Sequence, residues 1–131
     1  MTVDCRNQYA TIAVSSLNND LDIGKTDSML LTAVGVVENT DMKMSLAPES
    51  VQKYNGYAPY MQMDDFGKAP IICEVIEADI SIQTDRTDLY VDAINAEGYS
   101  VGRVPVTFED GYMRFTIGKT NPSIYYLIQA E

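Results

Sequence analysis

The chain has 131 residues, of which 46% are apolar and 21% charged, an ordinary globular composition without a disordered tract or an apolar run of about 18 residues. Its formal net charge of −10 argues against nucleic acid or an anionic membrane surface as a partner, because phosphate groups are bound mainly by clusters of Lys and Arg. We therefore expect one compact domain that neither spans a membrane nor binds nucleic acid.

Two runs rich in β-forming residues predict strands in the N-terminal half. They cover residues 9–16 and 28–37, and a polar loop at 17–27 separates them. Gly35, inside the second run, predicts a β-bulge or the close approach of another backbone segment.

The polar loop contains oxygen ligands at a spacing reminiscent of calcium loops. Asn18, Asp20 and Asp22 supply them, although Met29 stands where such a loop carries its bidentate Glu. A structural calcium ion, held at this loop or near Asp64 and Asp65, is the one cofactor that the sequence suggests, and we otherwise expect none.

Residues 38–69 form a long Met- and Tyr-rich connection before the next predicted strand, which begins near Pro70. A connection of about thirty residues is well above the usual loop length of a compact domain, and such segments are usually functional or mobile. Between Pro48 and Pro59 there is room for no helix longer than a turn or two, although Pro48 could start one.

From Pro70 onward, short β-branched and aromatic runs alternate with turn residues at intervals of about eight to twelve residues, as in a β-sandwich. On the run at 88–94, strand alternation places Leu89, Val91 and Ala93 on one face. The run at 123–128 is apolar on both faces, which indicates a central strand or one covered by a neighbouring domain. We predict an all-β fold: an antiparallel β-sandwich of Greek-key or jelly-roll type with about eight strands, forming a single module over residues 1–131.

The chain lacks most of the residues that carry common catalytic chemistry. It contains no histidine, no CxxC motif and no complete phosphate-binding loop. Adjacent carboxylates such as Asp64 and Asp65 point to opposite sides of an extended chain, so they would not easily flank one bond. We therefore expect that the chain is not an enzyme. Cys5 and Cys73 either form one disulfide or remain free thiols, and the sequence leaves both open.

Several motifs occur in a fixed order along the chain: SSLN at Ser15, LLTAVG at Leu30, ENTDM at Glu38, GKAPIICE at Gly67, VPV at Val104, FTIG at Phe115 and YYLI at Tyr125. As a set, over about residues 10 to 128, they resemble the C-terminal ancillary β-sandwich modules of large secreted bacterial glycoside hydrolases. The chain departs from that pattern at Asn18-Asn19, where Asp-Gly is usual, at Tyr125, where Trp is usual, and in the insert at 43–66.

The resemblance implies a non-catalytic accessory module excised from a larger multidomain enzyme. The catalytic carboxylates would then lie on another domain, and the expected partner of this module is a polysaccharide or the parent's catalytic domain. It also implies a secreted or cell-surface location, although the start of this chain does not read as a signal peptide.

The insert combines aromatic rings with carboxylates and amides, as carbohydrate-binding sites do. The candidate glycan-binding residues are Tyr54, Asn55, Tyr57, Tyr60, Gln62, Asp64 and Asp65. The alternative is a loop folded back so that its Tyr and Met side chains cover a sheet edge. Two functions therefore remain open: a carbohydrate-binding module, or a structural domain that packs against the parent's catalytic domain without binding glycan.

Overall fold

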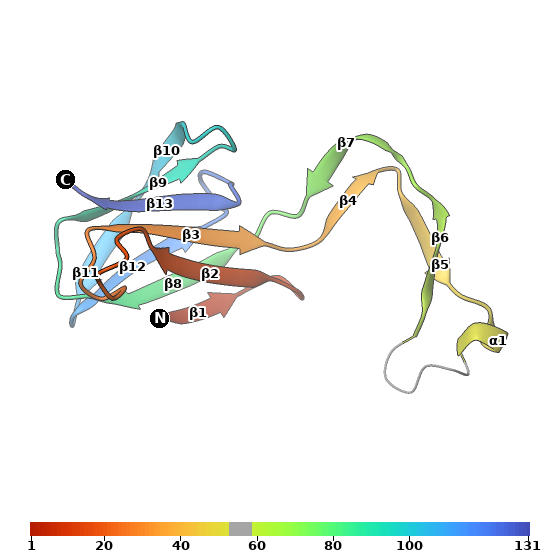
Figure 1. The fold of residues 1–131 in the computed structure, drawn as a ribbon, viewed down its shortest axis with the longest axis horizontal. Helices are drawn as coiled ribbons and strands as arrows, with labels where there is room; N and C mark the ends of the chain where they lie inside the picture. The colour runs from red at the N-terminus through yellow and green to blue at the C-terminus, as the bar shows by residue number, and fades with distance from the viewer. Residues whose placement is uncertain (53–58) are drawn as a thin grey trace. The chain divides into compact units, whose positions relative to one another are not determined.

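The computed structural model describes residues 1–52 and 59–131, which divide into two compact units. The first unit, Met1–Val36 with Glu74–Glu131, is called the sandwich here, and the second, Val37–Cys73, is called the ribbon. The segment that the sequence suggested as a long connection within one module is thus a unit with regular strands of its own (Figure 1).

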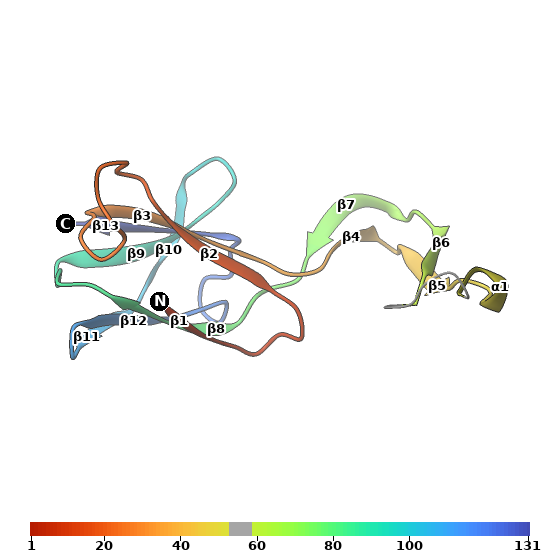
Figure 2. The ribbon, with the colours of Figure 1, turned by 60° about the horizontal axis from the view of Figure 1, so that its bottom comes forward.

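The sandwich is built from two antiparallel sheets, which confirms the predicted all-β fold (Figure 1). The four-stranded sheet has the order β1-β8-β12-β11, with β1 Thr2–Cys5, β8 Ala78–Gln83, β12 Tyr112–Ile117 and β11 Val106–Glu109. The five-stranded sheet has the order β10-β9-β13-β3-β2, with β10 Ser100–Val104, β9 Leu89–Ile94, β13 Tyr125–Ala130, β3 Ser28–Val34 and β2 Thr11–Ser16. Figure 2 shows the two sheets as separate layers.

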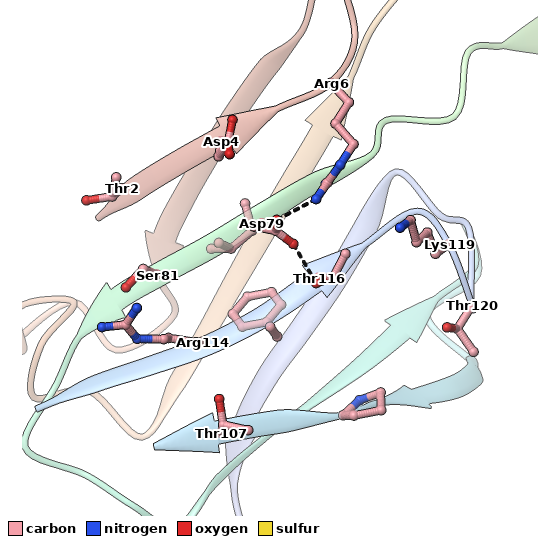
Figure 3. A pocket seen from close by; sticks show the side chains of 13 residues that line it. Thr2, Asp4, Arg6, Asp79, Ser81, Thr107, Arg114, Thr116, Lys119 and Thr120 are labelled. Atoms are coloured by element: carbon pink, nitrogen blue, oxygen red, sulfur yellow. Dashed lines mark hydrogen bonds and ion pairs between the residues drawn. The ribbon is translucent and has the colours of Figure 1, made fainter. Parts of the chain in front are cut away.

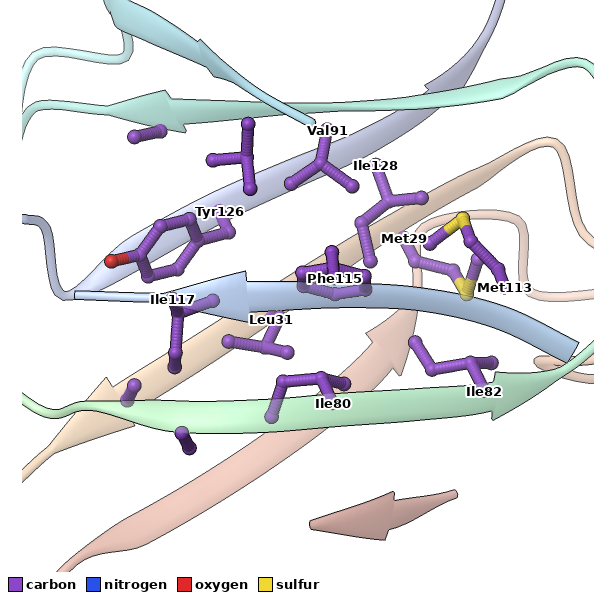
Figure 4. Close-up of a cluster of buried hydrophobic side chains, with 14 of the residues drawn as sticks. Met29, Leu31, Ile80, Ile82, Val91, Met113, Phe115, Ile117, Tyr126 and Ile128 are labelled. Carbon is purple, nitrogen blue, oxygen red and sulfur yellow. The ribbon is translucent and has the colours of Figure 1, made fainter. Parts of the chain in front are cut away.

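The hydrophobic core fills the space between these two layers. On β9, Leu89, Val91 and Ala93 are buried, as the alternation predicts. Interior side chains of both sheets pack into one cluster (Figure 4), whose members include Met29, Leu31, Ile80, Ile82, Met113, Phe115, Ile117, Tyr126 and Ile128. Both sheets therefore have one core face and one outward face.

Strand β13 lies between β9 and β3 at the centre of its sheet, which explains why its sequence is apolar on both faces. The predicted close approach at Gly35 is also confirmed, because an added Cβ would lie 2.6 Å from Cδ1 of Ile76 and 3.3 Å from the carbonyl oxygen of Tyr9. Strand β1 was not predicted. It is short and lies at a sheet edge, and its pairing of Val3 with Ile80 of β8 defines it.

The ribbon consists of two antiparallel strand pairs in succession. Strand β4 Val37–Thr40 pairs with β7 Lys68–Cys73, and β5 Lys43–Leu46 pairs with β6 Met61–Asp65, while the single-turn helix α1 Glu49–Gln52 follows β5. Among the described residues of the ribbon only Ala47 is buried, so this part of the chain has no hydrophobic core of its own. An isolated two-stranded pairing is marginally stable in water at best.

Both cysteines are free thiols: Cys5 is half-buried at the end of β1, and Cys73 is exposed at the end of β7. The sequence allowed either a disulfide between Cys5 and Cys73 or two free thiols, and the structure has the free thiols. No helix in the described part of the chain is long and apolar enough to cross a membrane.

Candidate functional site

The predicted glycan-binding residues fall into two groups. Tyr54, Asn55 and Tyr57 lie outside the described residues. The others, Tyr60, Gln62, Asp64 and Asp65, lie on β6 or directly before it. Tyr60 as a whole residue is 44% exposed.

Strand β6 brings Gln62 and Asp64 together on one face. Nε2 of Gln62 donates a hydrogen bond to Oδ1 of Asp64 at 2.8 Å. Hydrogen bonds from Gln62 and from Ser45 on β5 hold the pKa of Asp64 below its usual range. Asp65 points to the other face and accepts the N–H of Gly67 at 2.9 Å. The structure thus unites Gln62 with Asp64, and Asp65 instead closes the turn between β6 and β7.

Four apolar side chains lie on the opposite face of the β5–β6 pairing. Met44 lies directly opposite Met63, and Leu46 lies opposite Met61. These four side chains are between 42% and 63% exposed. Other strands of the ribbon and the turn before β7 expose further large side chains. We call these eight the apolar ribbon residues: Val37, Met44, Leu46, Met61, Met63, Phe66, Ile71 and Ile72.

The predicted calcium residues lie in the loop between β2 and β3. Oδ1 of Asn18 accepts the N–H of Asp20 at 3.2 Å, and the carbonyl oxygen of Asp22 accepts the N–H groups of Lys25 and Thr26 at 2.9 and 3.0 Å. Within residues 1–52 and 59–131, no three His, Cys, Asp or Glu side chains gather where they could hold a metal ion. Local hydrogen bonds account for the shape of this loop, and calcium binding stays a prediction.

A hollow that the sequence did not reveal lies on the outward face of the four-stranded sheet. It is open to solvent and has a volume of about 580 Å³. Side chains from β1, β8, β11 and β12 and from the loop after β12 line it (Figure 3). We call it the sheet hollow, and its polar lining residues are Thr2, Asp4, Arg6, Asp79, Ser81, Thr107, Arg114, Thr116, Lys119 and Thr120.

Asp79 lies at the centre of the hydrogen bonds in the sheet hollow. Thr116 donates its hydroxyl to Oδ1 of Asp79 at 2.6 Å, and Arg6 forms an ion pair with Oδ2 (Figure 3). The bond from Thr116, followed by the bond from Arg6, lowers the pKa of Asp79 below its usual range. In contrast, neither Arg114 nor Lys119 has a carboxylate of the described residues within ion-pair distance.

These contacts predict a pH dependence of stability at Asp79. Because its pKa is lower in the folded than in the unfolded chain, ionised Asp79 stabilises the fold above its unfolded pKa of about 3.9. That contribution is lost as the pH falls through the lower folded pKa. We expect Asp79→Asn to lower the melting temperature at pH 7, and the difference from wild type to shrink below about pH 4.

Thermal unfolding of both proteins between about pH 7 and pH 2.5 measures this effect. Asp20→Asn is the matched control, because it removes one carboxylate from an exposed loop. A deficit of Asp79→Asn that stays constant down to the lowest pH would show that the ionised carboxylate contributes nothing to folding.

The sheet hollow can recognise a ligand by hydrogen bonds and charge, since it presents hydroxyls, two cations without an ion-pair partner and one fixed carboxylate. The ribbon instead presents apolar side chains. No family model, curated protein or solved structure matches the chain.

Proposed function

We propose that the chain is a non-catalytic accessory module of a secreted or cell-surface glycoside hydrolase, and that its ribbon binds the catalytic domain of that enzyme. The observation that carries the docking role is that the apolar ribbon residues are exposed, whereas Ala47 is the one buried residue in the described part of the ribbon. Among the apolar ribbon residues, Met44, Leu46, Met61 and Met63 are neighbours on one face of the β5–β6 pairing, and adjacent exposed apolar side chains of this kind mark interaction sites. The link to a glycoside hydrolase comes from the order of the sequence motifs.

The carboxylates favour a non-catalytic role. A glycosidase needs one carboxylic acid whose pKa is raised so that it can protonate the leaving group. Among the described residues, every Asp or Glu with a shifted pKa is shifted downward, namely Asp64, Glu74, Asp79 and Asp88. Hydrogen bonds to the ionised form cause each of these shifts, so all four groups are poor proton donors at neutral pH.

The side-chain types favour a protein partner for the ribbon over a polysaccharide. Met44, Met61 and Met63 are flexible and polarisable, and methionine is enriched at protein interfaces. Sugars bind by stacking on aromatic rings. The described part of the ribbon offers two such rings, those of Tyr60 and Phe66, and its other exposed apolar side chains are aliphatic or Met. Glycan binding at Tyr60, Gln62, Asp64 and Asp65 is the competing proposal.

Substitution of exposed ribbon residues tests the docking role. Leu46→Ser and Phe66→Ser change side chains that are 63% and 73% exposed, so the stability of the module alone should shift by no more than about 0.5 kcal/mol. Each should weaken binding to the catalytic domain of the parent polypeptide by roughly tenfold, measured by titration calorimetry. Tyr99→Ser, 72% exposed on the sandwich, is the matched control that should leave the affinity unchanged.

Affinity gels with soluble polysaccharides complete this test. Failure of the wild-type module to bind the catalytic domain contradicts docking. Retention on a polysaccharide gel that is lost in Tyr60→Ala would then establish glycan binding by the ribbon in its place.

A further inference from the structure

The pairing register sets one row of polar side chains across the whole four-stranded sheet. Thr2 of β1 lies opposite Ser81 of β8, Ser81 lies opposite Arg114 of β12, and Arg114 lies opposite Thr107 of β11. All four side chains line the sheet hollow. The row thus places one guanidinium group among three hydroxyl groups on neighbouring strands.

In a second row of polar side chains across the sheet, two of the three residues already form a hydrogen bond with one another. Asp4 lies opposite Asp79, and Asp79 lies opposite Thr116. Asp79 accepts hydrogen bonds from Thr116 and Arg6, so these groups neutralise and position one another. Their contacts leave Arg114 and Lys119 as the cations of the hollow without an ion-pair partner among the described residues.

The charge of the hollow is opposite to that of the chain. Its lining contains Arg6, Arg114 and Lys119 against Asp4 and Asp79, a local balance of +1. The whole chain carries −10. The net charge of the chain therefore disfavours an anion, whereas the local charge of this hollow favours one.

The loop that carries Lys119 is held in place from the core. The hydroxyl group of Tyr126 accepts the N–H groups of Gly118 and Ser123 and donates to the carbonyl oxygen of Asn121, each at 3.2 Å. These bonds fix both sides of the segment that carries Lys119 and Thr120 at the rim of the hollow. A rim that is ordered before binding loses less conformational entropy on binding.

The size and chemistry of the hollow define the class of ligand. Small-molecule sites usually enclose about 300–1,000 Å³, and the sheet hollow, at about 580 Å³, can hold a short oligosaccharide segment. The backbone N–H groups of the inner strands form hydrogen bonds to neighbouring strands, so only side chains could donate hydrogen bonds to an inorganic anion in the hollow. The hydroxyls of Ser81, Thr107 and Thr120 both donate and accept hydrogen bonds, as sugar hydroxyls do.

We propose that the sheet hollow binds an acidic saccharide, in which Arg114 and Lys119, at opposite ends of the hollow (Figure 3), each contact a different carboxylate or sulfate group. The hydroxyl groups of Thr2, Ser81 and Thr107 contact the sugar hydroxyls. This site is separate from the ribbon surface of the proposed docking function, and it does not depend on it. Pro105 also lines the hollow and offers an apolar contact, whereas the side chains of Ile80 and Phe115 pack into the core on the other face of the sheet.

Titration calorimetry of the full chain tests the proposal with four probes: trigalacturonate, a sulfated galactan trisaccharide, neutral galactotriose and sodium sulfate. At least one acidic trisaccharide should bind at least about ten times more tightly than galactotriose, and added salt should weaken its binding. Arg114→Gln and Lys119→Gln should each reduce that affinity about tenfold, the loss expected for a charge-assisted hydrogen bond.

Lys25→Gln is the matched control, because Lys25 is an exposed cation outside the hollow and its loss should leave the affinity unchanged. Melting temperatures of all three variants should stay within about 3 °C of wild type, since surface substitutions change stability little. Leu46→Ser should bind the acidic trisaccharide like wild type, which separates this site from the ribbon.

Four results would each overturn the proposal. The first is that neither acidic trisaccharide binds. The second and third are that galactotriose or sodium sulfate binds as tightly as the acidic trisaccharides do. The fourth is that Arg114→Gln and Lys119→Gln do not lower the affinity for the acidic trisaccharide more than Lys25→Gln does. Equal affinity for sodium sulfate would identify an anion site only.

Discussion

Gly118→Ala is expected to lower the free energy of unfolding by about 3 kcal/mol or more. Gly118 has a φ of +92°, and an added Cβ would lie 2.2 Å from the carbonyl oxygen and 2.9 Å from the carbonyl carbon of Ile76. Both contacts are to backbone atoms, so a side-chain rotation cannot relieve them. Either the loop after β12 or the segment before β8 has to move, and urea unfolding of the variant measures the cost.

Gly111→Ala is the matched control. Gly111 also has a positive φ, +77°, but an added Cβ there would meet nothing within 4 Å. Its replacement should therefore cost only the conformational penalty of about 1 kcal/mol. Equal destabilisation of the two variants would show that the backbone angle alone, and not the contact with Ile76, sets the cost at Gly118.

Local sequence predicts the strands of the sandwich because apolar residues alternate with polar ones along them, and the apolar positions indicate the buried face. The buried positions Leu89, Val91 and Ala93 follow directly from the two-residue period of a strand. The same reasoning misses β1, where Thr2–Cys5 is too short to show a period and becomes a strand through its pairing with β8.

The ribbon could not be predicted in the same way because its strands have no core face. Met44, Leu46, Met61 and Met63 form cross-strand pairs whose apolar side chains stay exposed, so their pattern suggested a loop that covers a sheet edge. Which residues pair across a long hairpin depends on the strand register. Register is specified where one face of the strands is buried, and the strands of the ribbon have no such face.

The sheet hollow was missed for a related reason. Thr2, Ser81, Thr107 and Arg114 each occupy an outward position that, taken alone, indicates an ordinary solvent-exposed face. They become one row only through three strand pairings, two of which join segments distant in sequence. Long-range pairing of this kind is determined by the whole fold and leaves no local motif.

Tyr126→Ala should destabilise the sandwich by about 4 kcal/mol, the range found for large aromatic residues in cores. Tyr126 is fully buried at the centre of the five-stranded sheet, and its hydroxyl group ties down the loop from Gly118 to Ser123 (Figure 4). Burial also raises the pKa of Tyr126, which keeps the hydroxyl protonated and able to donate to Asn121. Urea unfolding measures the loss.

Tyr126→Phe separates the hydroxyl from the ring. It keeps the packing but leaves the N–H groups of Gly118 and Ser123 without that acceptor, so we expect a loss of about 1–3 kcal/mol. Tyr90→Phe is the control, since the Tyr90 hydroxyl makes one bond of 3.3 Å to the side chain of Gln129 in a half-buried setting and should matter less. If Tyr126→Phe is as stable as wild type, the three hydrogen bonds give no net stabilisation, and the order of the loop that carries Lys119 must come from packing alone.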